Sequence, residues 1–216
     1  MSFLLRVQLP DRPGSLGTLA LALGSIGADI LSLEVMERGP GYAVDDLVVE
    51  MPPGALPDTL LTAAENLDGV RVDSIRPYTG ILDTHRELEL IDHVATARDD
   101  RLQVLADAVP RILRVGWCTV LDTGVQGVYR VVGSPSAPET QALDIPWMPL
   151  DKPKVLEEEA DWVPPIWKDM DTKLAAAPLG GTGKVLLLGR PGGPSFRPSE
   201  VARAGYLAGI VSTVLG

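Results

Sequence analysis

The fold of the N-terminal region is decided by residues 4–35, which read LLRVQLPDRPGSLGTLALALGSIGADILSLEV. Apolar and polar residues alternate over Phe3–Leu9, and this period of two predicts a half-buried strand. The turn-forming residues Asp11–Gly14 follow it. Apolar residues then recur at helical spacing from Ser15, which is expected to cap the helix with its side chain. The stretch therefore predicts a strand, a tight turn and a helix.

The residues that flank this stretch extend the same pattern. Arg6 is expected on the polar face of the first strand, and Leu31, Leu33 and Val35 share one face of a second strand. The further expected elements are strands over Asp29–Glu37, Tyr42–Met51 and Val70–Arg76, and a helix over Asp58–Leu67. The order β-α-β-β-α-β over residues 1–79 is the ferredoxin-like arrangement.

A second region of different texture begins after Pro77-Tyr78-Thr79-Gly80. The elements expected there are helices over Thr84–Ala97 and Arg101–Leu113, strands over Gly116–Asp122, Val125–Gly133 and Lys184–Gly189, and a helix from Pro198. Residues 134–183 show no sustained apolar period, so we expect this segment to be the most mobile part of the chain. The fold class is therefore expected to be α+β, with one domain over residues 1–79 and another over residues 80–216.

Composition excludes several classes of partner. The chain has 216 residues, a net charge of −10 and a pI near 4.6, a balance that repels phosphate backbones and anionic lipids. We therefore expect neither nucleic acid nor membrane as a partner. The single cysteine, Cys118, excludes a disulfide framework within the chain. Residues 1–10 lack a basic segment ahead of an apolar core, so they are expected to form a strand, not a signal peptide, in a cytoplasmic protein.

The stretch Leu4–Val35, with the loop D-R-P-G-S-L at residues 11–16, resembles an ACT domain, a small regulatory module that binds amino acids. The resemblance covers residues 1–79. In ACT domains, the loop after the first strand and the start of the second strand line the ligand site, and modules commonly pair across a two-fold axis. The resemblance thus implies a homodimer with the site at its interface. The site residues that it implies are Asp11, Arg12, Pro13, Gly14, Ser15, Leu16, Asp29 and Ile30.

The chemistry of these residues is compatible with an amino acid as ligand. Gly14 has no Cβ, so a ligand can approach the backbone closely. The free N–H groups at the start of the helix favour a carboxylate, and Asp29 is able to accept hydrogen bonds from an ammonium group. The family often has Asn in place of Asp29, which leaves the identity of the ligand open. In the alternative interpretation Pro13-Gly14 is only a tight turn and Asp29 a solvated residue.

Residues 81–216 look like a divergent GAF-type sensor domain, because two helices, a strand hairpin, a long crossover, a strand and a packing helix follow one another. GAF domains bind small molecules in a pocket over their sheet. Cys118 lies in the middle of a strand and is expected to be a buried structural thiol. Trp147, Trp162 and Trp167 either form a lid over a pocket or fill the core, and core filling is favoured.

Patterns typical of catalysis and metal binding are missing from the sequence. It contains neither a nucleophile elbow nor a dinucleotide fingerprint. Gly180–Lys184 departs from a phosphate loop, because Pro178 and Val185 occupy positions that need Gly and Ser or Thr. His85 and His93 are eight residues apart without a carboxylate–histidine pattern, so we expect neither a metal nor a cofactor.

The sequence therefore predicts an amino-acid-binding regulatory protein, a sensor without catalytic activity of its own. Two alternatives stay open. In the first alternative, the chain is an allosterically regulated enzyme of amino-acid metabolism whose C-terminal domain is catalytic. In the second, it is an interaction scaffold that binds no ligand.

Overall fold

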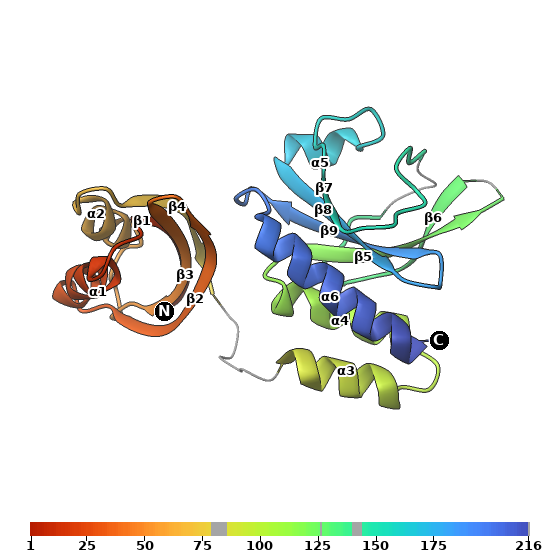
Figure 1. Ribbon diagram of the computed structural model, residues 1–216, viewed down its shortest axis with the longest axis horizontal. Coiled ribbons are helices and arrows are strands. Elements are labelled where there is room, and N and C mark those ends of the chain that lie inside the picture. Colours follow the sequence, from red (N-terminus) through yellow and green to blue (C-terminus); the bar gives the residue numbers. More distant parts are fainter. Residues whose placement is uncertain (79–85, 126, 140–143, 216) are drawn as a thin grey trace. The chain divides into compact units, whose positions relative to one another are not determined.

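The structure is a computed structural model that describes residues 1–78, 86–125, 127–139 and 144–215. The chain divides into two compact units, Met1–Leu82 and Asp83–Gly216 (Figure 1). Each unit combines one antiparallel sheet with helices, so the expectation of a mixed α and β fold is confirmed. Among the described residues, no helix is both long enough and apolar enough to cross a membrane.

Unit 1 is a four-stranded sheet with two helices on one of its faces (Figure 1). Its elements are β1 (Ser2–Pro10), α1 (Ser15–Ser25), β2 (Asp29–Gly39), β3 (Tyr42–Glu50), α2 (Asp58–Glu65) and β4 (Arg71–Pro77). The strands lie in the order β2-β3-β1-β4, so β2 and β4 form the edges. Helix α1 contacts both β1 and β2, the two neighbours of β3, and therefore crosses the face of β3.

The core of unit 1 lies between the sheet and the two helices. Alternate residues of β1 enter it, as the period of two predicts, and α1 contributes residues one turn apart. Its buried members are Phe3, Leu5, Val7, Leu9, Leu19, Leu23, Ala28, Leu47, Val49, Met51, Leu60 and Ala64. Burying such side chains stabilises the fold by about 1.5–3 kcal/mol each.

The edge strand β2 shows the expected alternation, but its apolar face is not buried. Leu31, Leu33 and Val35 alternate with less exposed neighbours, as expected for residues on one face, and they are 38%, 40% and 49% exposed. Two irregularities, at Leu31 and at Met36, interrupt the pairing of β2 with β3. Because β2 has a neighbouring strand on one side only, its apolar residues are not enclosed.

A buried ion pair joins the two central strands of unit 1. Arg6, expected on a solvated face, is only 1% exposed and lies directly opposite Asp46 of β3. Its Nε donates to Oδ1 of Asp46 at 2.6 Å and its Nη2 to Oδ2 at 2.9 Å, a bidentate arrangement. Removing one partner of such a buried pair leaves an uncompensated charge, which costs about 3–5 kcal/mol.

Unit 2 is a five-stranded sheet with the strand order β6-β5-β9-β8-β7. Its elements are α3 (Arg86–Thr96), α4 (Arg101–Ile112), β5 (Trp117–Gly124), β6 (Gly127–Gly133), β7 (Lys154–Leu156), α5 (Pro165–Asp169), β8 (Thr172–Leu179), β9 (Lys184–Pro191) and α6 (Pro198–Leu215). The sheet carries a separate hydrophobic cluster on each face.

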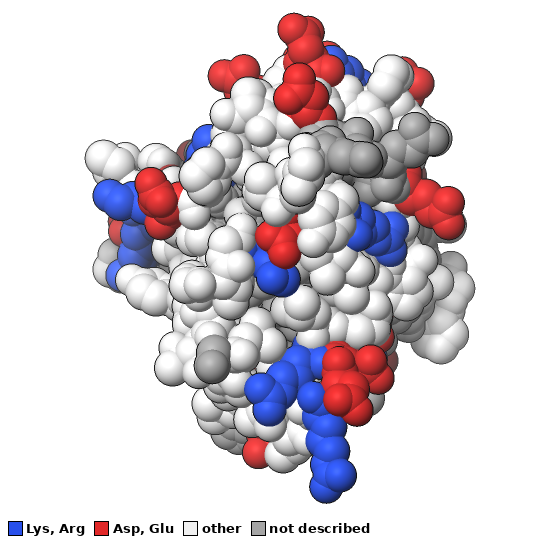
Figure 2. All heavy atoms as spheres, turned by 90° about the vertical axis from the view of Figure 1, so that its right-hand side faces the viewer, with Lys and Arg blue, Asp and Glu red and all other residues white. Residues whose placement is uncertain are grey.

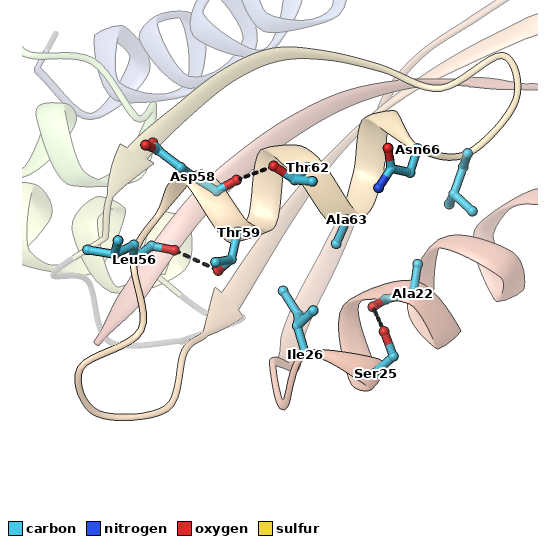
Figure 3. Close-up of a pocket in the computed structure, with 10 residues that line it drawn as sticks. Ala22, Ser25, Ile26, Leu56, Asp58, Thr59, Thr62, Ala63 and Asn66 are labelled. Carbon is cyan, nitrogen blue, oxygen red and sulfur yellow. Dashed lines mark hydrogen bonds between the residues drawn. The ribbon is translucent and has the colours of Figure 1, made fainter.

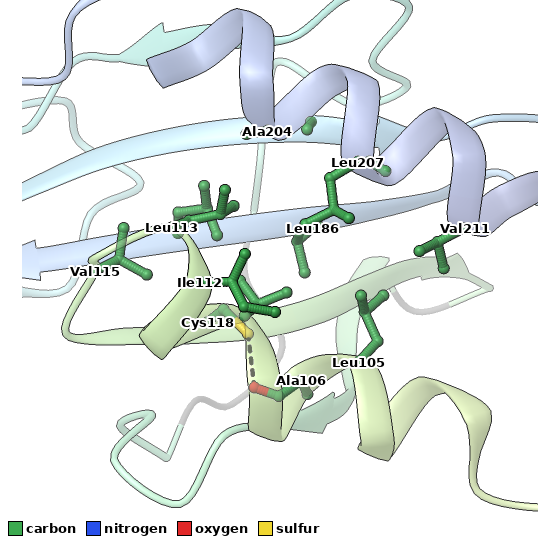
Figure 4. Packing of buried hydrophobic residues seen from close by; sticks show 14 of the residues in the cluster. Leu105, Ala106, Ile112, Leu113, Val115, Cys118, Leu186, Ala204, Leu207 and Val211 are labelled. Carbon is green, nitrogen blue, oxygen red and sulfur yellow. Dashed lines mark hydrogen bonds between the residues drawn. The ribbon is translucent and has the colours of Figure 1, made fainter. Parts of the chain in front are cut away.

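The first cluster of unit 2 lies between the sheet and helices α4 and α6 (Figure 4), and it extends to α3, which packs against these two helices. Leu186 of β9 and Leu207 of α6 both belong to it and are buried. Cys118 of β5 is also buried there, and its Sγ donates to the carbonyl oxygen of Ala106 at 3.1 Å. Burial raises the pKa of the Cys118 thiol to about 12, so the thiol is neutral at pH 7.

Residues 134–183, for which the sequence predicts no regular structure, contain secondary structure that packs in the second cluster. This segment contains β7, α5 and β8, and β8 pairs along its whole length with β9. The strand was missed because its sequence, TKLAAAPL, is rich in alanine and proline, which are depleted in strands. Its pairing on both sides supplies the order that local propensity does not.

Tryptophans contribute much of this second cluster. Trp167 of α5 is 1% exposed, and its ring centroid lies 4.9 Å from that of Trp117 of β5. Trp147 and Trp162 pack against the cluster and contact each other edge-on at 5.5 Å. All three tryptophans of the connecting segment therefore take part in core packing, the interpretation that the sequence favours.

A second buried ion pair connects β9 to α6. Nη2 of Arg190 lies 2.6 Å from Oε1 of Glu200, and both residues are buried. The other carboxylate oxygen of Glu200 accepts a hydrogen bond from the backbone N–H of Arg197 at 2.8 Å. This bond caps the first turn of α6 as in a capping box. The guanidinium of Arg190 also lies over the ring of Phe196, 4.2 Å from its centroid.

Charged side chains are scattered over the face of the molecule drawn in Figure 2. The described Lys and Arg residues visible there alternate with acidic and uncharged ones, without merging into one basic surface. The expectation that the protein binds no nucleic acid stays a prediction.

The pairing of β8 predicts slow hydrogen exchange in a segment expected from sequence to be mobile. We expect the paired amides of Thr172–Leu179 to exchange as slowly as those of Lys184–Pro191, because both strands are bonded on two sides. Hydrogen exchange followed by mass spectrometry measures this. Fast exchange throughout Thr172–Leu179 would contradict the sheet order.

The compactness of unit 1 predicts that it folds independently. A protein comprising residues 1–82 is expected to unfold cooperatively and to show mixed α and β circular dichroism, because its core cluster draws only on its own strands and helices. Thermal and urea denaturation of residues 1–82 measure this, with the full chain as the reference. A disordered fragment would show that unit 2 supplies part of the core.

Candidate functional site

The loop between β1 and α1 meets the turn between α2 and β4 around a cavity of about 320 Å³. We call it the loop cavity. Its lining residues are Pro10, Arg12, Pro13, Gly14, Ser15, Thr18, Leu67, Asp68 and Val70. The cavity thus joins two segments that are far apart in the sequence.

The N-terminus of α1 forms one wall of the loop cavity. Gly14 is the N-cap residue, in the left-handed conformation with φ of 94°, and its carbonyl oxygen accepts the backbone N–H of Thr18 at 2.9 Å. The expectation that the Ser15 side chain caps α1 is wrong, because α1 has no side-chain cap. The hydroxyl of Ser15 is buried and has no hydrogen-bond partner in the described part of the chain.

The start of α1 also presents backbone donors. The N–H of Ser15 donates to the carbonyl oxygen of Arg12 at 3.3 Å. For the N–H groups of Leu16 and Gly17 the described residues supply no backbone acceptor, as is usual in the first turn of a helix. These donors and the positive end of the helix dipole favour a bound anion.

The turn between α2 and β4 forms the opposite wall. Gly69 has φ of 77°, and a Cβ at this position would lie 2.9 Å from Cγ of Pro10. Glycine is therefore required there both for its conformation and for the close approach to β1. This approach holds Asp68 beside the loop that follows β1.

Two opposite charges line the loop cavity. Within the described ranges, neither the guanidinium of Arg12 nor the carboxylate of Asp68 has a hydrogen-bond or ion-pair partner in the protein. Pro10, Leu67 and Val70 add apolar surface between them. A cavity with an unpaired cation, an unpaired anion and apolar walls is complementary to a small zwitterion.

The structure brings together only part of the site that the sequence predicts. Arg12, Pro13, Gly14 and Ser15 line the loop cavity, whereas Asp11 and Leu16 adjoin these residues without lining it. Asp68 and the other residues from the α2–β4 turn were missed, because only the tertiary fold brings that turn to the loop.

Asp29 and Ile30 lie at the other end of the sheet. Asp29 is opposite Glu50, which is opposite Ser2 at the start of β1, whereas the loop follows Pro10 at the end of β1. The length of β1 separates the two ends by about 27 Å. Asp29 and the loop therefore do not contact the same small ligand within a single chain, and the site expected at a homodimer interface stays a prediction.

A second, more open groove of about 510 Å³ lies between α1 and α2 (Figure 3). Its lining residues are Ala22, Ser25, Ile26, Leu56, Asp58, Thr59, Thr62, Ala63, Asn66 and Leu67. The hydroxyls of Ser25, Thr59 and Thr62 all donate to nearby backbone carbonyls, so they are already engaged. Asp58 is the only charged residue of the lining, and the groove is less suited to a zwitterion than the loop cavity.

Metal binding finds no support in the part of the chain that the structure describes, where no group of three or more His, Cys, Asp and Glu residues is arranged to hold an ion. His93 is exposed near the end of α3, and His85 lies outside the described residues.

Comparison with known proteins does not place the chain in a family. No family model matches it. The chain is 29% identical over 72 residues to NAD-dependent malic enzyme 1 of Bacillus subtilis (strain 168), which is 33% of this chain and 16% of that enzyme. The match therefore spans only a small part of the curated relative.

Solved structures similar to the chain include GAF domains. One belongs to an Acinetobacter phosphoenolpyruvate-protein phosphotransferase, with 11% identity and a TM-score of 0.41 over 62% of this chain and 94% of that one. Another belongs to a sensor histidine kinase of Pseudomonas syringae pv. tomato, with 12% identity and a TM-score of 0.43 over 61% and 83%. A bacteriophytochrome of R. palustris shows 10% identity and a TM-score of 0.45 over 83% and 41%. Scores at this level do not assign the chain to a family.

The conformation of Gly14 predicts opposite effects for two glycines close together in the sequence. Gly14→Ala is expected to lower the free energy of unfolding by about 1–2 kcal/mol, because alanine disfavours a φ of 94° although a Cβ there meets no other atom. The matched control, Gly17→Ala, is expected to raise it by about 0.5–1 kcal/mol, since Gly17 is an exposed helical residue with open space around it. Urea denaturation of both variants measures this, and equal effects would contradict the assigned N-cap.

Proposed function

We propose that the protein is a regulatory sensor that binds a small amino acid in the loop cavity and has no catalytic activity of its own. The observation that carries the proposal is the pair of unpaired opposite charges, Arg12 and Asp68, on the lining of one cavity. The D-R-P-G-S-L loop, on which the resemblance to ACT domains rests, forms part of the same cavity.

In the proposed complex the α-carboxylate lies at the N-terminus of α1. The guanidinium of Arg12 pairs with it, and the positive end of the α1 dipole favours its negative charge. Hydrogen bonds of this charge-assisted kind are about twice as strong as neutral ones. Support comes from the left-handed Gly14, which leaves this end of the helix free of a side-chain cap.

The ammonium group is proposed to pair with Asp68 on the opposite wall. The side chain of the ligand then lies against Pro10, Leu67 and Val70. A volume of about 320 Å³ is at the lower end of the range for ligand pockets, and together with the apolar walls it favours an amino acid with a small, apolar side chain.

We further propose that the protein acts as a homodimer, in which Asp29 and Ile30 of one copy approach the loop of the other. In a single chain these residues are too far from the loop to contact the same ligand. Support for a dimer comes from β2, an eleven-residue edge strand with three partly exposed apolar side chains. Unpaired edges of this kind favour association with another strand.

The absence of catalysis is part of the proposal. Cys118, the single thiol of the chain, is buried with a raised pKa and is therefore a poor nucleophile. The buried pair of Arg190 and Glu200 is engaged in holding α6 to β9. An assay that showed turnover of an amino acid by the full chain would replace the sensor with a regulated enzyme.

The test of the proposed function is a thermal-shift screen of the full chain against the twenty amino acids, followed by calorimetric titration of those that stabilise it. Asp68→Asn is expected to weaken binding roughly 10–150-fold, because it removes a charge-assisted hydrogen bond. Asp58→Asn is the matched control, since Asp58 is also an exposed aspartate but lines the groove between α1 and α2.

Two outcomes would contradict the proposal in different ways. If none of the twenty amino acids binds the wild-type chain, the amino-acid sensor is wrong and the scaffold remains. If Asp58→Asn weakens binding and Asp68→Asn does not, the ligand occupies the groove between the helices instead of the loop cavity.

A further inference from the structure

A buried carboxyl group lies on the face of the sheet that carries α1 and α2, and it belongs to none of the interactions described above. Asp45 of β3 is 4% exposed, and its Oδ1 has no hydrogen-bond partner among the described residues. It is directly opposite Val7, which packs in the core cluster with Leu19 and Leu23 of α1. Asp45 therefore faces the side of the sheet that α1 covers.

The charged groups that act on Asp45 lie on β2, on β3 and in the loop after β1. On the helix side, α1 carries no charged residue, and α2 carries Asp58 and Glu65, both exposed. On the strands, Arg38 of β2 attracts its carboxylate, and Asp46 of β3 repels it. The charge of Asp46 is offset by its bidentate pair with Arg6 of β1. From the loop, Asp11 repels the carboxylate as well.

Burial is the largest influence on Asp45 and raises its pKa above the ordinary value. Asp11 and Asp46 add to the increase, and Arg38 opposes it. Because the pKa in the folded state is raised, the neutral form is favoured by folding. The folded state is therefore stabilised as the pH falls through this pKa and loses that contribution as the pH rises.

Arg38 links Asp45 to the loop. Its Nη2 lies 3.8 Å from Oδ1 of Asp11, too far for a hydrogen bond, and its side chain is 70% exposed. Asp11 is the first residue of the loop and is held to the β2–β3 turn by a bond from its N–H to the carbonyl oxygen of Gly41 at 3.1 Å. The same guanidinium thus acts on the buried carboxyl group and on the start of the loop.

We propose that Asp45 is a proton-sensitive switch for the amino-acid site, so that the site binds more tightly when Asp45 is neutral. This rests on the proposed function. When Asp45 is ionised, it competes with Asp11 for Arg38 and adds a negative charge near the start of the loop that holds the ligand carboxylate. When Asp45 is protonated, Arg38 pairs with Asp11 alone, and the loop and the helix N-terminus become more favourable to the anion.

The switch predicts a pH-dependent affinity. Calorimetric titration of the full chain with L-alanine is expected to show binding that tightens by about fivefold or more as the pH falls through the titration of Asp45. Asp45→Asn, which has the shape of the neutral acid, is expected to bind tightly without this dependence. Asp73→Asn is the matched control, because Asp73 is an aspartate on β4 that pairs with Arg71, and it is expected to keep the dependence.

A second experiment tests the coupling between Asp45 and the loop in the absence of a ligand. In nuclear magnetic resonance titrations of the ligand-free chain, the amide shifts of residues 11–16 are expected to follow the same pKa as the Asp45 carboxyl carbon. Arg38→Gln is expected to leave Asp45 titrating and to abolish the matching change in the loop. This variant removes an exposed side chain, so it tests the link even if Asp45→Asn does not fold.

The two measurements separate the switch from the proposed function. Loop amides that do not respond to the titration of Asp45 would overturn the switch, as would an unchanged pH dependence of affinity in Asp45→Asn. If L-alanine and the other amino acids fail to bind at every pH while the loop follows Asp45, the sensor function fails and the coupling of Asp45 to the loop stands.

Discussion

The bidentate pair of Arg6 and Asp46 constrains the rest of unit 1. The two residues are directly opposite each other on the central strands β1 and β3, and both are buried. Because side chains alternate across a strand, a slip of one residue between β1 and β3 would carry one of the two charges into the apolar face that packs on the helices and leave the other unpaired. The cost of an unpaired buried charge therefore favours one register, and that register sets where β1 ends.

The end of β1 determines the composition of the candidate site. Pro10 lies opposite Tyr42, so the loop leaves the sheet beside the β2–β3 turn, while Asp29 begins β2 beside the start of β1. The close approach of Gly69 to Pro10 then brings Asp68 to the loop in place of Asp29. In the proposed complex, the charge that pairs with the ammonium group therefore comes from the α2–β4 turn, not from the start of β2 as the sequence predicts.

A buried ion pair also fixes how two elements of unit 2 pack together. The pair of Arg190 and Glu200 holds α6 against β9, and the two clusters on the faces of the sheet are filled by side chains of the chain itself. The tryptophans on the face away from α6 pack in this cluster. The loop cavity with its two opposite charges lies in unit 1, which is where ligand recognition is proposed.

The sequence by itself determined the kind and order of most elements, because the periods of two and 3.6 along β1, α1 and α6 report which side chains of each element pack together in a core. It also located Gly14, whose lack of Cβ is a local property. Tertiary structure alone decided the burial of Arg6, the exposure of Leu33 and the existence of β8, since each depends on which strands are neighbours. It likewise decided that Asp68 and not Asp29 faces the loop, because contacts between distant segments arise from strand register and helix packing, which no local period encodes.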